Sequence, residues 1–295
     1  MKRALAFIVI QLVLRPLQWL PMGAIHRLGN ALGTLMLKYP STKHIIIKTN
    51  LALAFPNLSI EERDNIHQRS VKQMACFALE SGKVWHANKS QLSKLVVQVK
   101  GWEQIEQAIG SGRGLLLVGA HLGNWEILNL YCMQRLDMAG LYRAPRDPLI
   151  NQWIRKARER FGGELIPSGS QSMRHLLRNL KTGGVAGIIA DQQPRLGEGV
   201  MAPFFGQPAS TMTLIGRLAQ RTHCHVLMAS CYRCQKKGFE IEITPVDDSI
   251  RSVDPLESAT ALNAAIEAAV RQRPDQYLWR YQRFPAQHYG EIHAN

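Results

Sequence analysis

The sequence predicts an α/β protein whose central, mostly parallel sheet is flanked by helices. From about residue 95 onward, apolar segments typical of strands alternate with segments of helical periodicity, the order expected of a parallel sheet. Uninterrupted apolar runs such as "LLLV" at 115–118 indicate strands that are covered on both faces. With 295 residues, 46% hydrophobic content and no internal repeat, the chain can form one large hydrophobic core.

The N-terminus predicts a membrane anchor rather than a cleaved leader. Two basic residues precede an uncharged run over 4–14, Arg15-Pro16 interrupts it, and a second uncharged run continues to Ile25. Neither run reaches the roughly 20 residues that cross a bilayer, and no small-residue cleavage site follows. We therefore expect a kinked span or a hairpin in the interface, with Trp19 among the headgroups and the basic end in the cytoplasm. The alternative is an ordinary buried helix that ends at Arg15-Pro16.

The chain then divides into an anchor with its lead-in helix over 1–40 and one α/β domain over 41–295. Helices are expected at 22–38, 60–88 with a break, 102–109, 124–137, 148–161, 171–181, 212–222 and 256–271. Strands are expected at 95–101, 114–120, 140–144, 184–191, 225–233 and 239–246. Ser59 and Glu62 have the spacing of a capping box, which predicts that a helix begins there.

The stretch "GAHLGNWEIL" at 119–128 holds the main candidates for chemistry. The strand over 114–120 leads directly into His121, and a helix begins near Asn124. Positions five apart in one helix point about 140° apart, so His121 and Glu126 can meet only if His121 lies on the turn before the helix. We predict that Glu126 holds one imidazole nitrogen while the other nitrogen takes a proton from a substrate hydroxyl. The alternative is a histidine that simply ends a strand, because this spacing also arises by chance.

Other polar residues stand where loops should follow strands or helices. Arg143 lies just past one strand, Asp191 and Gln192 end another, and Arg158 lies near the end of a helix. Loops at the carboxyl ends of parallel strands are where ligands bind, so these residues are candidates to support the site or bind substrate. Asp191 is expected to cap its turn or to pair with Arg158, and the alternative for Arg158 is a surface pair with a nearby glutamate. Without a Gly-x-Ser-x-Gly elbow, no serine nucleophile is expected.

Charge and cysteine content restrict the partners. The chain has 36 Lys and Arg against 22 Asp and Glu, a net charge of +14, which favours a polyanionic partner. Nucleic acid is not expected, because no zinc-finger, RNA-recognition or basic-zipper signature is present. The five cysteines are too sparse for a disulfide framework and suit a reducing cytoplasm. His223, Cys224, His225, Cys231 and Cys234 could ligate zinc by type, but a strand would turn them to different faces, so no metal site is expected.

Five sequence blocks, in this order and after a hydrophobic N-terminus, resemble the late acyltransferases of lipid A biosynthesis, the lauroyl/myristoyl acyltransferase family. The blocks are "AHLGNWE", "YRAP", "RKARERFGGELIP", "ADQ" with a downstream "PFFG", and "PDQYLWRYQRF". They cover nearly the whole chain, and their combined order is far more specific than any one of them.

This resemblance implies a fold similar to that of glycerolipid acyltransferases, with an N-terminal anchoring helix and 41–295 as the catalytic domain. It implies a catalytic dyad of His121 and Glu126, with Arg158 and Asp191 also essential. It further implies an acyl carrier protein thioester as donor, a lipid A precursor hydroxyl as acceptor, no cofactor, and a place on the cytoplasmic face of the inner membrane. Both the acidic carrier protein and the phosphate-bearing glycolipid suit a basic enzyme.

Two alternatives to this function stay open at the level of sequence. One is an acyltransferase for another glycolipid that uses an acyl-coenzyme A donor. The other is a non-catalytic basic protein of the membrane surface, for which the loss of His121 would have no consequence.

Overall fold

The computed structural model describes residues 12–39, 41–145, 147–169, 171–234 and 238–290, and it contains the predicted α/β sheet flanked by helices. The sheet order is β1-β9-β8-β2-β5-β3-β4. These strands are β1 (Val96–Lys100), β2 (Leu115–Gly119), β3 (Met138–Tyr142), β4 (Glu164–Pro167), β5 (Val185–Ile189), β8 (His225–Cys234) and β9 (Gly238–Pro245). Neighbouring strands are parallel except β8 and β9, which form an antiparallel pair.

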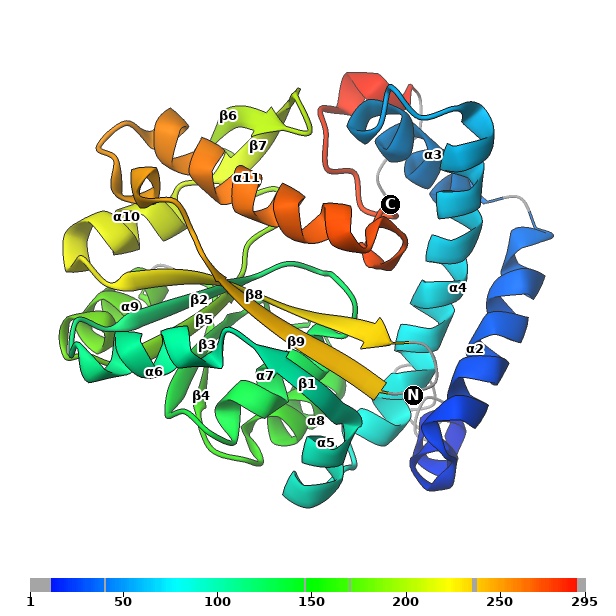
Figure 1. Cartoon of the computed structure of the whole chain (residues 1–295), viewed down its shortest axis with the longest axis horizontal. Coiled ribbons are helices and arrows are strands. Elements are labelled where there is room, and N and C mark those ends of the chain that lie inside the picture. Colours follow the sequence, from blue (N-terminus) through cyan, green and yellow to red (C-terminus); the bar gives the residue numbers. More distant parts are fainter. Residues whose placement is uncertain (1–11, 40, 146, 170, 235–237, 291–295) are drawn as a thin grey trace.

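Helices cover both faces of the sheet (Figure 1). One face carries α6 (Trp102–Gly110), α7 (Trp125–Met133) and α8 (Pro148–Glu159), and the other carries α9 (Ser172–Lys181), α10 (Leu214–Thr222) and α11 (Pro255–Gln272). The continuous apolar run of β2 explains this arrangement, because successive side chains in a strand point to opposite faces. Leu116 and Val118 belong to the cluster under α9–α11, while Leu115 and Leu117 belong to the cluster under α6 and α7.

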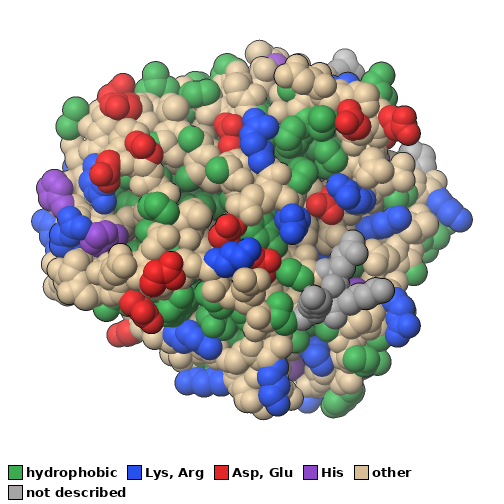
Figure 2. Space-filling view, viewed as in Figure 1, with side chains coloured by type: hydrophobic (Ala, Val, Ile, Leu, Met, Phe, Trp, Pro, Cys, Tyr) green, Lys and Arg blue, Asp and Glu red, His purple; other side chains and the backbone are tan. Residues whose placement is uncertain are grey.

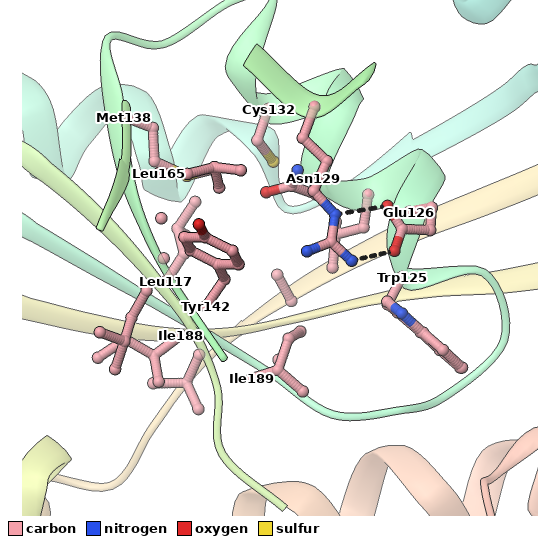
Figure 3. Close-up of a pocket in the computed structure, with 18 of the residues that line it drawn as sticks. Leu117, Trp125, Glu126, Asn129, Cys132, Met138, Tyr142, Leu165, Ile188 and Ile189 are labelled. Carbon is pink, nitrogen blue, oxygen red and sulfur yellow. Dashed lines mark hydrogen bonds and ion pairs between the residues drawn. The ribbon is translucent and has the colours of Figure 1, made fainter. Parts of the chain in front are cut away.

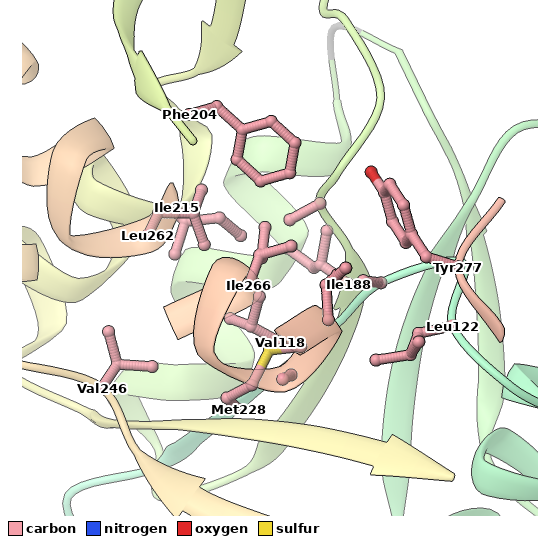
Figure 4. Packing of buried hydrophobic residues seen from close by; sticks show 14 of the residues in the cluster. Val118, Leu122, Ile188, Phe204, Ile215, Met228, Val246, Leu262, Ile266 and Tyr277 are labelled. Atoms are coloured by element: carbon pink, nitrogen blue, oxygen red, sulfur yellow. The ribbon is translucent and has the colours of Figure 1, made fainter. Parts of the chain in front are cut away.

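The core under α10 and α11 is close-packed and reaches the carboxyl end of β2 (Figure 4). Val118 and Ile188, from the adjacent strands β2 and β5, lie against Leu262 and Ile266 of α11. Leu122 and Tyr277 close the same cluster next to the turn that follows β2. That turn is therefore anchored on the core side.

Along the carboxyl edge of the parallel strands runs α4 (Ile60–Val84), followed by α5 (Lys89–Leu95) (Figure 1). The predicted capping box at the start of α4 is confirmed. The Ser59 hydroxyl accepts from Glu62 N at 3.1 Å, and the Glu62 carboxylate accepts from Ser59 N at 2.7 Å. The outer helix α2 (Met22–Leu37) packs on α4 through glycines. A Cβ atom at Gly29 would lie 2.6 Å from Cys76 Sγ, so only glycine allows this approach.

The predicted anchor is described only from residue 12 onward, since 4–11 fall outside the described residues. Arg15–Trp19 form the short 3₁₀-helix η1, and Trp19 is 76% exposed. No helix in the described part of the chain is both long and apolar enough to cross a membrane.

The sequence did not predict α3 (Thr42–Ala54), α5, the short strand β4, or the hairpin of β6 (Gly199–Phe204) and β7 (Gln207–Met212), which forms a separate antiparallel pair. The predicted helix over 124–137 is shorter and ends at Met133, after which the chain turns towards β3.

Candidate active site

His121 and Asp191 come together at the carboxyl ends of two adjacent parallel strands. β2 and β5 pair in register up to Gly119 and Ile189, so the residues that follow each strand emerge side by side. Asp191 Oδ1 lies 2.8 Å from His121 Nδ1, and the backbone N–H of His121 donates to Asp191 Oδ2 at 3.0 Å. The hydroxyl of Tyr277 donates to the same carboxylate. Asp191 thus fixes both the position and the ring orientation of His121.

The Asp191 carboxylate is nearly inaccessible to solvent yet remains ionised. Burial alone would raise its pKa, but the His121 imidazole and backbone N–H outweigh this, and the pKa of Asp191 lies below its ordinary value of 3.8. An ionised carboxylate can only accept hydrogen bonds, so a neutral His121 keeps its proton on Nδ1. The Nε2 atom is then free to accept a proton.

Glu126 is held by a different partner. It lies in the first turn of α7, and its two carboxylate oxygens accept from Arg158 of α8, one from Nε at 2.9 Å and the other from Nη2. The indole N–H of Trp85, at the end of α4, donates to Glu126 Oε2 at 3.2 Å. Burial would raise the pKa of Glu126, but Arg158, Trp85 and the charge of His121 outweigh it, so that pKa lies below 4.5.

The turn between His121 and α7 is fixed at every residue. Leu278 N donates to His121 O at 2.9 Å, and Gly123 N donates to Gln276 O at 3.0 Å. Gly123 has a φ of +60°, and a Cβ atom there would lie 2.0 Å from Cys231 O, so glycine is required. The C-terminal segment "PDQYLWRYQRF", for which no catalytic role was predicted, therefore supports this turn with its backbone.

A cavity of about 250 Å³ opens beside these groups. Its polar part includes His121, Glu126, Arg158, Arg143 and Gln192, so the structure places all the predicted site residues except the buried Asp191 in its wall. The rest of the lining is largely apolar and includes Leu117, Leu128, Cys132, Met138, Leu165, Ile188 and Ile189. In Figure 3, Trp125 and Glu126 lie on one side of the cavity and Met138 and Leu165 on the opposite side. Such a shape can hold a reacting polar group at the mouth and a hydrocarbon chain inside.

The carboxylate partners differ from the sequence expectation. Glu126 was expected to hold the imidazole, but the carboxylate on Nδ1 is Asp191, and Arg158 pairs with Glu126 rather than with Asp191. The reason is the strand order, because β2 and β5 are direct neighbours and bring 121 and 191 to one point. Glu126 begins a helix and faces α8 instead. The catalytic role of Glu126 stays a prediction.

Trp85 and Trp125 are further site residues that sequence reasoning did not identify. Trp125 packs edge-on against the His121 ring, with 4.9 Å between the ring centroids.

The candidate zinc ligands at 223–234 are dispersed. Cys224 and Cys231 are buried, while His225 Nε2 lies 2.7 Å from Arg113 Nη2, whose positive charge is an unfavourable neighbour for a metal cation. Within the described residues, no group of three or more His, Cys, Asp or Glu is arranged to hold a metal ion.

Comparison with known proteins identifies the family of the chain. The family model for bacterial lipid A biosynthesis acyltransferases matches residues 1–285. The lipid A biosynthesis lauroyltransferase of Escherichia coli K12 is 28% identical over 269 residues, which cover 90% of this chain and 86% of that protein. The palmitoleoyltransferase of lipid A biosynthesis in the same organism is 25% identical over 92% of this chain and 88% of its own length. The chain therefore belongs to the bacterial lipid A biosynthesis acyltransferase family.

Proposed function

We propose that the chain transfers a fatty acyl group from an acyl carrier protein thioester to a hydroxyl of a lipid A precursor, a secondary acylation in lipopolysaccharide biosynthesis. The observation that carries this proposal is the position of His121. Its imidazole is paired through Nδ1 with a buried carboxylate and lines the mouth of a largely apolar cavity. The names of the related lauroyl- and palmitoleoyltransferases support a fatty acyl donor and a lipid A acceptor.

In the proposed reaction, His121 acts as a general base. Its Nε2 takes the proton of the acceptor hydroxyl while the hydroxyl oxygen attacks the thioester carbonyl carbon. The tetrahedral adduct then collapses, the C–S bond breaks, and the imidazolium returns the proton to the leaving sulfur. Asp191 stabilises the imidazolium and keeps the ring in the productive tautomer.

Glu126 and Arg158 act as one unit in this proposal. The negative charge of Glu126 favours the imidazolium form of His121, as predicted for the dyad, although it does so without holding the ring nitrogen. The guanidinium of Arg158 offsets the charge of Glu126. This ion pair keeps the buried Glu126 ionised beside the imidazole, the form that can stabilise the imidazolium.

The donor is proposed to be acyl carrier protein because the chain is strongly basic. A net charge of +14 attracts an acidic protein over long range, and Arg143 is exposed at the cavity mouth. Figure 2 shows Lys and Arg side chains spread over one face of the molecule with acidic groups between them. Arg143 and Gln192 are proposed to contact the donor or the acceptor.

Membrane association is proposed to involve α2. Its buried face is formed by Ile25, Gly29 and Gly33, and the face beside it exposes apolar side chains at helical spacing. The exposed side chains are Leu28, Leu32, Leu35 and Met36. An apolar stripe of this kind suits a helix that lies in the bilayer interface. We propose that the chain works on the cytoplasmic face of the inner membrane, where its acceptor would be embedded.

The deciding experiment is transfer of a labelled acyl group from acyl carrier protein to a purified lipid A precursor in detergent. We expect activity in the wild type, a large loss in His121→Ala and Asp191→Asn, and wild-type rates in the control His175→Ala, which removes an exposed histidine paired with Glu164. Equal activity of His121→Ala and wild type would contradict the mechanism. Transfer only from acyl-coenzyme A, or only to another glycolipid, would reassign the substrates.

The membrane contact is tested separately with vesicles that contain anionic phospholipid. The double variant Leu28→Ser/Leu32→Ser should sediment less with these vesicles than the wild type. The control Val253→Ser removes an apolar side chain that is 83% exposed on a different part of the surface. Equal binding of all three proteins would reject α2 as the contact.

A further inference from the structure

A buried carboxylate behind the active site has no part in the proposed reaction. Glu80 of α4 is fully inaccessible to solvent, and both of its oxygens are occupied. Oε2 accepts from Arg233 Nη2 at 2.6 Å and from Asn124 Nδ2 at 2.8 Å, while Oε1 accepts from Arg233 Nε and lies 2.7 Å from His26 Nε2. An ionised carboxylate is stable at such depth only when it is paired, and Arg233 provides that pair.

Asn124 connects this carboxylate to the catalytic turn. It is the N-cap residue of α7, three residues after His121, and it is 1% exposed. Its side-chain oxygen accepts from Ile127 N at 3.0 Å, whereas its side-chain amide donates to Glu80. Serine, threonine or aspartate can also cap a helix. Asparagine differs from these three cap residues because it also has an amide that can donate to a buried carboxylate. The residue type therefore fits both contacts.

We propose that Glu80 is a positioning residue for the active site, which holds the turn over 121–124 and the first turn of α7 through Asn124. This inference rests on the proposed acyl transfer. Glu80 lies on α4, Arg233 on β8 and His26 on α2, so three elements fix one point of the turn. Because α7 carries Glu126, the same contact sets the distance between Glu126 and His121.

The consequence for catalysis follows from geometry. The backbone contacts to Gln276, Cys231 and Leu278 hold the turn, and the Asn124 side chain ties the first turn of α7 to Glu80. A misplacement of about 1 Å in a catalytic group costs on the order of 100-fold in rate, even when the substrate still binds. A loosened Asn124 is therefore expected to lower kcat while KM changes little.

The test compares Asn124→Ser with Asn88→Ser. Serine at 124 keeps a cap acceptor for Ile127 N and leaves the pair of Glu80 and Arg233 intact, but it has no amide for Glu80. Asn88 is also an N-cap, of α5, and it is exposed and away from the cavity, so its variant reports the loss of an asparagine cap alone. Glu80→Gln serves as a second variant if it folds.

We expect Asn124→Ser to lower kcat by about 10- to 100-fold with KM within about threefold of wild type. Amide hydrogen exchange over 119–128 should become faster, and Asn124→Ser should lower Tm more than Asn88→Ser, because it removes a buried hydrogen bond to a charged group. Wild-type kcat and wild-type exchange in Asn124→Ser would overturn the proposal. If the wild type itself shows no acyl transfer, the proposed function fails, but the exchange measurement still tests whether Glu80 holds the turn.

Discussion

Replacement of Arg158 by lysine tests the ion pair that organises the active site. The Arg158 guanidinium meets both oxygens of Glu126 through two separate N–H groups, with Nε to Oε2 at 2.9 Å. A lysine ammonium is a single point of charge and cannot span both oxygens in the same parallel geometry. Arg158→Lys therefore keeps the charge but loses one charge-assisted hydrogen bond.

The expected magnitude follows from burial. The Glu126 side chain is 3% exposed and that of Arg158 is 21% exposed, so solvent screens this pair little. A hydrogen bond to a charged group contributes about 1.5–3 kcal/mol, and we expect Arg158→Lys to lower the free energy of unfolding by about that amount at pH 7. Arg155→Lys is the matched control on the same helix, because Arg155 pairs with Glu159 through one bond with 43% and 28% of the side chains exposed. That surface pair should contribute no more than about 0.5 kcal/mol.

The assay is urea unfolding of both variants and the wild type at pH 7 and then at successively lower pH values below 4.5. Because the pKa of Glu126 is lowered in the folded state, its contribution to stability is complete above its ordinary value of 4.5 and is lost as the pH falls through the folded-state value. The deficit of Arg158→Lys should therefore shrink towards acid. A deficit no larger than that of Arg155→Lys, or one that does not depend on pH, would refute this account of the pair.

Three further predictions follow from the structure. Gly123→Ala should destabilise the fold by more than about 2 kcal/mol in urea unfolding, because its Cβ would meet Cys231 O at a positive φ; a stable, active variant would contradict this. Met138→Ala enlarges the apolar part of the cavity, so relative kcat/KM across donor lengths should shift towards longer chains by about fourfold per methylene, and an unchanged profile would argue against an acyl pocket here. Burial and the charges of His44 and Lys48 lower the pKa of His67 to about 4. Between about pH 6.5 and 4 the unfolded chain therefore binds one proton more than the folded chain, and the free energy of unfolding falls as the pH drops through that range. His67→Asn should flatten this pH dependence in urea unfolding.

The sheet could be predicted because its strands carry strong local signals. β2 is a continuous apolar run, and β5, β8 and β9 are bounded by turns, so their positions follow from the sequence. The elements that were missed lack such signals. β4 has only four residues and ends at Pro167, and α3 contains three consecutive isoleucines, which favour a strand by themselves.

The sequence predicts which residues form the candidate site, but not which of them pair with one another. His121 and Asp191 were placed at strand ends by local pattern alone. Which carboxylate meets the imidazole depends on the order of strands in the sheet, and β2 neighbours β5 although residues 120–184 separate the two strands along the chain. Glu126, only five positions away, is closer in sequence but is turned towards α8 by the helix it begins. Proximity along the chain was therefore a weaker guide than strand adjacency.

In the described part of the chain, three carboxylates are buried, and the proposed mechanism gives one of them a chemical role and two a structural role. Asp191 is paired with His121, Glu126 with Arg158, and Glu80 with Arg233. Each pair joins different elements of the fold, and removing one partner would leave a buried charge without compensation. Arginine keeps its proton throughout the physiological range, whereas imidazole is the side chain type that gains and loses a proton near neutral pH. In the proposed mechanism, two of the pairs therefore hold fixed charges that position the turn and α7, and proton transfer is confined to the third, at the mouth of the cavity.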